Sequence, residues 1–240
     1  MNLHLVIGTP MYGGMCTSEY TQSLLNLSES ANKSDVKLTT IFLGNESLIQ
    51  RGRNTVAHHF MELPDATHLL FIDADIKFRT EDIVKMIQAD KSLIIGPVAL
   101  KGYNWDEIRQ AAVNGEDDIG RTGGVFNINH LPGIDMVNEN EPFEIEHGGN
   151  AFMMIRRDVF ETLKPHTPIY TNGGRSLPDG VEIYDYFRVE INKDTNHLLS
   201  EDYFLCHSYR QLGGKVWCAP WVETGHFGSH LFNGKYSRNN

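Results

Sequence analysis

The chain has 240 residues, 40% of them hydrophobic and 22% charged, a composition typical of a globular protein long enough to bury a core. Its formal net charge of −10 argues against nucleic acid as a partner, because proteins that follow phosphate backbones need a basic surface. No apolar run approaches the roughly 20 residues of a membrane-spanning helix, and the first residues lack the charged region of a signal peptide, so we expect a soluble, cytoplasmic protein.

The first hundred residues alternate between short apolar runs, typical of buried strands, and segments whose apolar residues recur at helical spacing. The predicted strands are 3–10, 36–43, 67–73 and 91–100. The predicted helices are 17–33, which begins at Thr17 or Ser18, 45–61, and 80–89, which begins at Thr80. Strands separated by helices indicate right-handed crossovers and a mostly parallel sheet.

The second part of the chain is less regular. Residues 101–147 are rich in Gly, Asn, Asp and Glu and predict a mobile or irregular insertion. Beyond it the sequence predicts a strand that turns into a helix, a strand, a helix capped by Ser200, and a last strand; their ranges are 150–163, 181–191, 198–214 and 215–220. The whole pattern indicates an α/β protein with a single Rossmann-like domain over residues 1–240, its central sheet flanked by helices.

The stretch "HLLFIDADIKF" contains an apolar run, typical of a buried strand, that is followed directly by Asp73 and Asp75. In a parallel α/β sheet, ligands bind at the carboxyl ends of the strands. Residues two apart in an extended segment point to the same side, so the two carboxylates would repel each other unless a cation lies between them. Carboxylate oxygens suit Mg²⁺ or Mn²⁺. The alternative is that Asp73 caps a turn and Asp75 is a solvated loop residue.

Three segments, in their order and spacing, resemble those of nucleotide-sugar-dependent glycosyltransferases of the GT-A fold, close to family 2-type and to viral or phage enzymes of that class. The segments are "FIDADIKF", "GGNAFMMIRRDVFETL" and "SEDYFLCHSYRQLGGKVWCAPWVETGHFGSH". Together with the N-terminal alternation they cover most of the chain except residues 101–147. The resemblance implies that residues 1–100 bind the nucleotide sugar and that residues 101–240 bind the acceptor.

The resemblance also assigns the metal site. Asp73 and Asp75, with Ala74 between them, match the family's DxD motif and would hold a divalent metal against the donor's diphosphate, where it stabilises the leaving group as a Lewis acid. His226 matches the family's C-terminal histidine ligand, and His230 is a substitute candidate. An imidazole ligand favours Mn²⁺ over Mg²⁺. Either histidine could instead be an ordinary solvated side chain.

Two acidic residues open the helix that follows Ser200. By the resemblance, Asp202 matches the family's catalytic aspartate, which deprotonates the acceptor hydroxyl, and Glu201 would bond to the donor or acceptor sugar. A single base suggests direct displacement with inversion at the anomeric carbon. The alternative is that both residues only complement the helix dipole, as acidic residues in a first turn commonly do.

The nucleotide end is expected after the first strand, in "GTPMYGG". There Thr9 and Pro10 would contact the base or ribose and Tyr12 would stack on the base of a UDP- or GDP-sugar, UDP being favoured; a plain Pro-Gly turn is the alternative. Arg53 falls on or beside the buried stripe of the helix 45–61. A cation near a buried face needs an anionic partner, so it either pairs with an aspartate of the DxD segment or reaches the diphosphate.

On the sugar side, the run "HGGN" includes Gly148, Gly149 and Asn150, and its glycines would let the backbone approach a sugar closely. Glycines at a loop-to-strand junction are also ordinary turn residues. Trp221 could stack on the face of an acceptor carbohydrate.

Three other functional classes compete with the glycosyltransferase interpretation. A haloacid-dehalogenase-type phosphohydrolase also places D-x-D after an apolar strand, but on the first strand and with a downstream metal motif that this sequence lacks. A sugar nucleotidyltransferase would need a basic, Gly-rich loop after the first strand, and "GTPMYGGMC" contains no Lys or Arg. A non-catalytic nucleotide- or carbohydrate-binding module is the third possibility. Replacing Asp202 distinguishes it from an enzyme, because only an enzyme would lose turnover.

Overall fold

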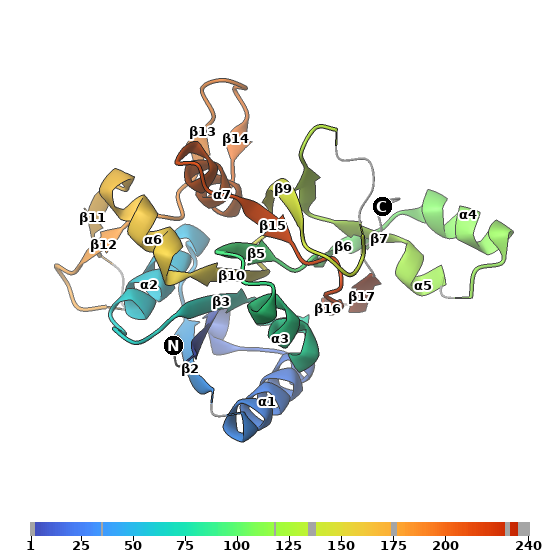
Figure 1. Ribbon diagram of the computed structural model, residues 1–240, viewed down its shortest axis with the longest axis horizontal. Coiled ribbons are helices and arrows are strands. Elements are labelled where there is room, and N and C mark those ends of the chain that lie inside the picture. The colour runs from blue at the N-terminus through green and yellow to red at the C-terminus, as the bar shows by residue number, and fades with distance from the viewer. Residues whose placement is uncertain are drawn as a thin grey trace.

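The computed structural model describes residues 3–34, 36–117, 119–133, 138–173, 177–228 and 231–234. Within these residues the centre is an eight-stranded sheet in the order β2-β1-β3-β10-β5-β15-β9-β8 (Figure 1). The strands are β1 (His4–Met11), β2 (Lys37–Gly44), β3 (His68–Ile72), β5 (Leu93–Ile95), β8 (Ile128–His130), β9 (Phe143–Gly148), β10 (Phe152–Arg156) and β15 (Val216–Cys218). β10 and β9 run against their neighbours, and the other strands share one direction. The prediction of a mostly parallel α/β sheet is confirmed.

Helices cover both faces of this sheet. They are α1 (Ser18–Lys33), α2 (Ile49–Met61), α3 (Thr80–Gln88), α6 (Arg157–Leu163) and α7 (Glu201–Gln211). Successive residues of β3 divide between the two faces, because side chains alternate along a strand. Leu69 and Phe71 pack in one core cluster with residues of α2, α6 and α7, and Leu70 and Ile72 pack in a second cluster with residues of α1 and α3.

Helix α2 lies very close to β1, and this contact depends on Gly8. A Cβ atom placed on Gly8 would lie 2.4 Å from Cγ1 of Val56, a buried β-branched side chain with little freedom to move. The close approach seats α2 against the sheet and brings Arg53 of this helix to the edge where β3 ends.

The predicted elements of the first 90 residues are confirmed, with small changes at their ends. Thr17 caps α1 by accepting a hydrogen bond from the Tyr20 N–H at 3.2 Å. Thr80 is the first residue of α3 rather than its cap, and no side chain caps that helix. The strand predicted at 91–100 is divided: β5 ends at Ile95, and β6 (Ala99–Tyr103) pairs instead with β7 (Gly124–Phe126).

The prediction that residues 101–147 are irregular is wrong for most of the segment. It contains α4 (Trp105–Asn114), α5 (Ile119–Thr122), β7, β8 and the start of β9, and the last two strands extend the central sheet. Residues 118 and 134–137 lie outside the described part. The strand predicted at 181–191 is also broken into two short pieces. Outside the central sheet the short strands are β4 (Ile76–Lys77), β11 (Ile169–Thr171), β12 (Glu182–Tyr184), β13 (Glu190–Ile191), β14 (Leu198–Leu199), β16 (Thr224–Phe227) and β17 (Leu231–Gly234).

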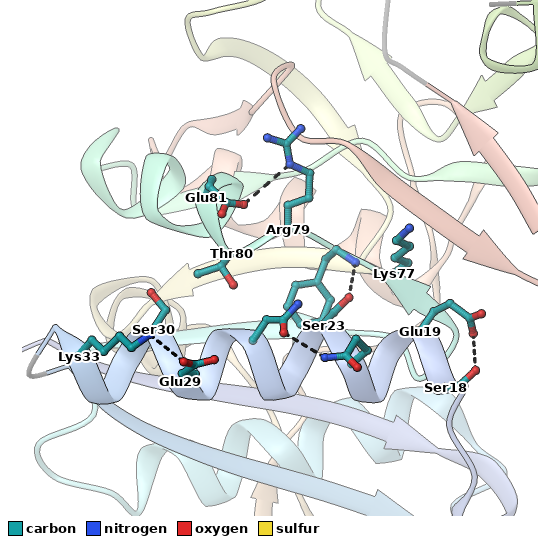
Figure 2. Close-up of a pocket in the computed structure, with 13 residues that line it drawn as sticks. Ser18, Glu19, Ser23, Glu29, Ser30, Lys33, Lys77, Arg79, Thr80 and Glu81 are labelled. Carbon is teal, nitrogen blue, oxygen red and sulfur yellow. Dashed lines mark hydrogen bonds and ion pairs between the residues drawn. The ribbon is translucent and has the colours of Figure 1, made fainter.

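A polar groove of about 770 Å³ runs between α1 and the segment 77–81 (Figure 2). Serine, asparagine and glutamine side chains and charges of both signs line it. At its floor the Ser23 hydroxyl accepts a hydrogen bond from the Phe78 N–H at 3.1 Å. This contact ties α1 to the segment that follows Asp75.

Among the helices of the described residues, none is long and apolar enough to cross a bilayer.

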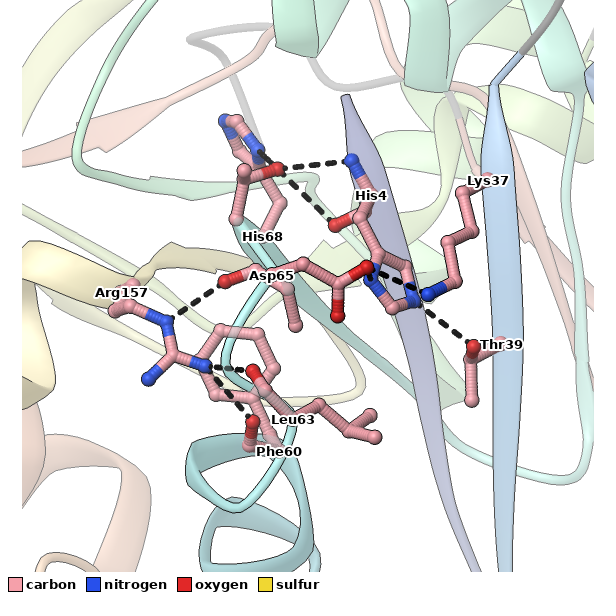
Figure 3. A network of polar contacts seen from close by, with 10 residues as sticks. His4, Lys37, Thr39, Phe60, Leu63, Asp65, His68 and Arg157 are labelled. Atoms are coloured by element: carbon pink, nitrogen blue, oxygen red, sulfur yellow. Dashed lines mark hydrogen bonds and ion pairs between the residues drawn. The ribbon is translucent and has the colours of Figure 1, made fainter. Parts of the chain in front are cut away.

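The loop between α2 and β3 is held by Arg157, the first residue of α6 (Figure 3). Its guanidinium donates to the carbonyl oxygens of Ala66 at 2.7 Å, Phe60 at 3.1 Å, and Leu63. It also lies 5.0 Å from the centre of the Phe60 ring. A cation at the C-terminal end of a helix is stabilised by the helix dipole and satisfies carbonyl groups that the helix leaves free.

On the other side of the same loop, Asp65 joins two strands. Its carboxylate accepts from Lys37 of β2 at 2.5 Å and lies 3.3 Å from Nδ1 of His4 in β1. The connection that precedes β3 is therefore fixed from both sides, and the start of β3 keeps its position relative to α2.

We expect Arg157→Ala to lower the free energy of unfolding by about 2–4 kcal/mol, because several backbone carbonyls lose their donor together. Arg157→Lys keeps the charge but not the planar, forked guanidinium group. Its free energy of unfolding should therefore lie between those of wild type and Arg157→Ala. Urea denaturation measures the change. The control is Arg109→Ala, an arginine with 74% of its side chain exposed. Equal losses for Arg157→Ala and Arg109→Ala would contradict the capping role.

Candidate active site

The Asp73-Ala74-Asp75 turn lies at the carboxyl end of β3 and is held by the backbone on both sides. The Asp73 N–H donates to the Ala151 carbonyl at 3.1 Å, and the Thr17 N–H donates to the Ala74 carbonyl at 2.9 Å. The Ile76 N–H closes the turn on the Asp73 carbonyl at 3.1 Å. The turn is therefore a fixed part of the sheet edge.

Asp75 faces two nitrogen atoms. Its Oδ2 lies 2.5 Å from the Lys101 ammonium and 3.5 Å from Nε2 of His226. Nδ1 of His226 lies 2.8 Å from the Ala99 carbonyl oxygen, which can only accept, so Nδ1 donates this hydrogen bond and Nε2 is the ring nitrogen that faces Asp75. Burial alone would raise the pKa of Asp75, but the hydrogen bonds from His226 and Lys101 lower it below its ordinary value.

The backbone fixes the separation of Asp75 and His226. β16 pairs with β4 in an antiparallel ladder that places His226 opposite Ile76. The Phe227 N–H donates to the Asp75 carbonyl at 2.8 Å. Strand β16 thus brings His226 to the Asp73-Ala74-Asp75 turn.

Arg53 is buried between two carboxylates. Its Nη2 lies 3.3 Å from Oδ1 of Asp73, and its Nε lies 3.2 Å from Oε1 of Glu201. Its guanidinium carbon lies 5.5 Å from the centre of the Phe71 ring, and Nη1 is buried without a partner among the described residues. Burial alone would lower the pKa of Arg53, but the charges of Asp73, Glu201 and Asp202 raise it above its ordinary value. The sequence left open whether Arg53 pairs with an aspartate, and this pairing is present.

Asp202 lies in the first turn of α7 and is almost completely buried. Its Oδ1 accepts from the Ser200 hydroxyl and from the Tyr203 N–H at 2.8 Å, while Oδ2 accepts a longer bond from the Asn150 N–H at 3.3 Å. Ser200 occupies the cap position, but its hydroxyl binds Asp202 rather than a backbone N–H. These donors and the helix dipole stabilise the carboxylate.

One cleft of about 190 Å³ brings Arg53, Asp73, Asp202 and His226 together, while Asp75 and Glu201 contact these residues but are not among those that line it. It lies at the edge of the sheet where β3 and β5 end, the usual ligand position in α/β sheets. Its lining residues are Arg53, Asp73, Ile95, Gly96, Val98, Leu100, Asn127, Ile128, Gly149, Asn150, Ala151, Asp202 and His226. Groups from the first, middle and last parts of the chain, predicted separately from the sequence, therefore share one cavity.

The Asn150 amide is the strongest sign of a ligand in this cleft. The residue is 1% exposed, and neither its Oδ1 nor its Nδ2 has a hydrogen-bond partner among the described residues. A buried amide without partners is costly unless a ligand or water satisfies it.

Gly148 is constrained by packing, since a Cβ there would lie 3.1 Å from Ile128 and 3.2 Å from the Asn127 carbonyl oxygen. The adjacent Gly149 donates its N–H to that same carbonyl at 3.0 Å.

The residues predicted for the nucleotide base do not line this cleft. The Thr9 hydroxyl is buried and lies 2.6 Å from the Tyr20 hydroxyl, so it has a protein partner. Pro10 follows in β1, and Tyr12 lies in the short 3₁₀ turn after this strand with 73% of its surface exposed. The ring is exposed at the end of β1, where it can contact a base.

Two further candidates stand apart from the cleft. Trp221 packs against the core cluster on the α1 and α3 side and is not a lining residue. His230 lies outside the described residues. Among the described residues no group of three or more His, Cys, Asp and Glu side chains is arranged to hold a metal ion, because Asp73 turns to Arg53 and only Asp75 faces His226.

An aromatic and amide cluster beside Asp202 was not identified as a unit from the sequence. The His147 ring stacks on Tyr203 with 3.9 Å between ring centres. The Tyr203 hydroxyl donates to the Asn127 side-chain oxygen and accepts from Asn129 at 2.9 Å. This cluster braces α7 against β8 and β9. The two asparagines are two apart, the spacing of side chains on one side of an extended segment, and that spacing was the available signal.

Comparison with known proteins supports the fold. No family model and no curated protein matches the sequence. Among solved structures, protein A197 from STIV is similar with a TM-score of 0.50 and 13% identity, over 98% of this chain and 95% of that chain. At this identity the likeness concerns the fold alone.

Two other solved structures show weaker likeness, with TM-scores too low to support an argument. One is a glycosyltransferase involved in the glycosylation of the major capsid of PBCV-1, with a TM-score of 0.33 and 7% identity over 68% of this chain and 64% of that chain. The other is a UDP-glucose pyrophosphorylase complexed with UDP-glucose, with a TM-score of 0.42 and 8% identity over 91% of this chain and 90% of that chain.

The His147 cluster should make stability depend on pH. Burial lowers the pKa of His147 below its ordinary value of about 6.5. The stabilisation from the neutral ring is therefore complete above about pH 6.5 and is lost as the pH falls through the lower folded-state pKa. Urea titrations between pH 7.5 and 5 should show a smaller loss for His147→Phe, which keeps the stacked ring, than for wild type. His197→Phe, at an exposed site, is the control and should follow wild type. Parallel pH profiles for all three proteins would contradict the expectation.

Proposed function

We propose that the protein is a metal-dependent GT-A glycosyltransferase that moves a sugar from a UDP- or GDP-sugar to the hydroxyl group of a carbohydrate or another acceptor. The observation that supports it is the single cleft that gathers Arg53, Asp73, Asp202 and His226 at the carboxyl edge of the sheet. A haloacid-dehalogenase-type reaction would need Asp73 as a free nucleophile, whereas here Arg53 pairs with it.

The residues at the DxD turn fit a divalent metal. Nε2 of His226 and Oδ2 of Asp75 are 3.5 Å apart, close enough for one ion to contact both, since bonds to a small divalent cation measure about 2.0–2.2 Å. The second ring nitrogen is held by the Ala99 carbonyl, the usual arrangement around a metal-binding histidine. A site with few protein ligands is expected when substrate phosphates supply the others. The mixed nitrogen and oxygen donors favour Mn²⁺.

The bound ion would neutralise charge on the leaving diphosphate. Side chains of the protein would bind the donor and activate the acceptor. Arg53 orients Asp73 and presents its unpartnered Nη1 near the diphosphate, and the Asn150 amide hydrogen-bonds sugar hydroxyls. Asp202 takes the proton of the acceptor hydroxyl as the acceptor oxygen bonds to the anomeric carbon and the bond to the diphosphate breaks. With Asp202 as the one base that acts on the acceptor, displacement would be direct and would invert the anomeric carbon.

The donor-binding half of this proposal is tested by calorimetric titration of UDP and GDP with and without Mn²⁺. Wild type should bind at least one of them more tightly when Mn²⁺ is present. Asp75→Asn should remove that enhancement, because one ligand charge is lost while the side-chain shape is kept. Asp106→Asn, on the exposed surface of α4, should behave as wild type. If Mn²⁺ enhances neither nucleotide in wild type, the proposed function is wrong.

The catalytic half is tested at Asp202. Once mass spectrometry has identified an accepted donor, Asp202→Asn should lower turnover by about 10²–10⁴-fold, the usual contribution of a general base, with little change in donor affinity. Asp194→Asn, in an exposed loop, is the matched control. A protein that binds the donor but shows the same turnover in wild type and Asp202→Asn would be a binding module rather than this transferase.

A further inference from the structure

Lys101 is a charged group at the Asp73-Ala74-Asp75 turn that no part of the proposed mechanism uses. It lies in β6, two residues after Ala99, whose carbonyl orients His226. Its ammonium is 2.5 Å from Oδ2 of Asp75, and the same oxygen faces Nε2 of His226. A lysine nitrogen and an imidazole nitrogen therefore converge on one carboxylate oxygen.

This convergence creates a conflict with a metal ion. An ion that contacts Oδ2 of Asp75 and Nε2 of His226 would lie beside the Lys101 ammonium, and two cations at that separation repel each other. Lys101 is able to move, since 40% of its side chain is exposed and its four-carbon stem is flexible. Arg53 cannot move in the same way, because it is buried and bonded to both Asp73 and Glu201.

We propose that Lys101 is an exchangeable cation that occupies Asp75 in the free protein and passes to the diphosphate of the donor when a divalent ion takes its place. The proposal rests on the proposed function and adds a device to it. The ammonium neutralises Asp75 while no metal is bound, and after the exchange it gains a charge-assisted contact with a phosphate oxygen.

The exchange couples metal and nucleotide binding. Metal alone must displace Lys101 without giving it a new partner, so Lys101 weakens the binding of metal alone. When the nucleotide is also present, the displaced ammonium has a phosphate to bind, so Lys101 strengthens the binding of the nucleotide in the metal complex. Because coupling between two ligands is reciprocal, each ligand should raise the affinity for the other. A purely structural surface ion pair would produce neither effect.

The test measures the two affinities separately in Lys101→Met. Mn²⁺ alone, followed by the EPR signal of free Mn²⁺, should bind roughly tenfold more tightly than to wild type, and UDP at saturating Mn²⁺ should bind roughly tenfold more weakly, the scale of one charged hydrogen bond. Lys101→Arg keeps the charge and should stay near wild type in both titrations. Lys77→Met removes the same charge two residues from Asp75 and should change neither affinity beyond the small effect of a more distant charge.

The outcomes separate this proposal from the proposed function. Opposite shifts in the two affinities of Lys101→Met, absent in Lys77→Met, support the exchange. Weaker or unchanged Mn²⁺ binding by Lys101→Met, or tighter Mn²⁺ binding with unchanged UDP affinity, overturns it while wild-type Mn²⁺-dependent UDP binding keeps the transferase proposal. Wild type that binds neither UDP nor GDP with Mn²⁺ overturns the proposed function itself. Thermal melts of the variants confirm that each is folded.

Discussion

The arrangement of the site depends on the buried arginine between Asp73 and Glu201. A buried charge is strongly unfavourable unless ionic partners surround it, and here the partners come from the end of β3 and the start of α7. Helix α2, β3 and α7 must therefore keep one mutual position for Arg53 to remain paired. Because Asp202 directly follows Glu201, the same interaction sets the position of Asp202 relative to the DxD turn. The ion pairs of Arg53 therefore both stabilise the core and fix the geometry of the cleft.

Much of the fold was predictable because its signals are local. The buried runs of β1 and β3 and the helical spacing of α1 and α2 are properties of single segments, and they correctly placed the elements of the first 90 residues. Strand direction is not local: β10 has the same buried run whether it is parallel or antiparallel to β3, so its insertion between β3 and β5 was not predicted. The composition of residues 101–147 wrongly predicted irregular structure where α4 lies. Two signals in the sequence indicated this helix: Asn104 caps it, and Gly115 ends it in a left-handed conformation.

The candidate site shows the same division. Asp73, Asp202 and His226 belong to recognisable segments, and the structure places all three in one cleft. Lys101, Asn127 and His147 come from the region whose composition indicated irregular structure, and nothing in their spacing links them to the Asp73-Ala74-Asp75 turn. Their positions follow from the β6–β7 pairing and from β8 joining the central sheet, which are contacts between segments far apart in the chain. Tertiary pairing, rather than residue type, makes them part of the site.

The charges at the cleft explain why a metal and an anionic donor belong together in the proposed function. The carboxylates of Asp73, Asp75, Glu201 and Asp202 outnumber the cations Arg53 and Lys101 that lie among them. A diphosphate entering such a network alone would meet net repulsion, and a divalent ion entering alone would have to displace an ammonium already bound to Asp75. Entering together, the ion and the diphosphate neutralise each other and leave Lys101 with an anionic partner, so the least costly occupied state of this cleft contains both.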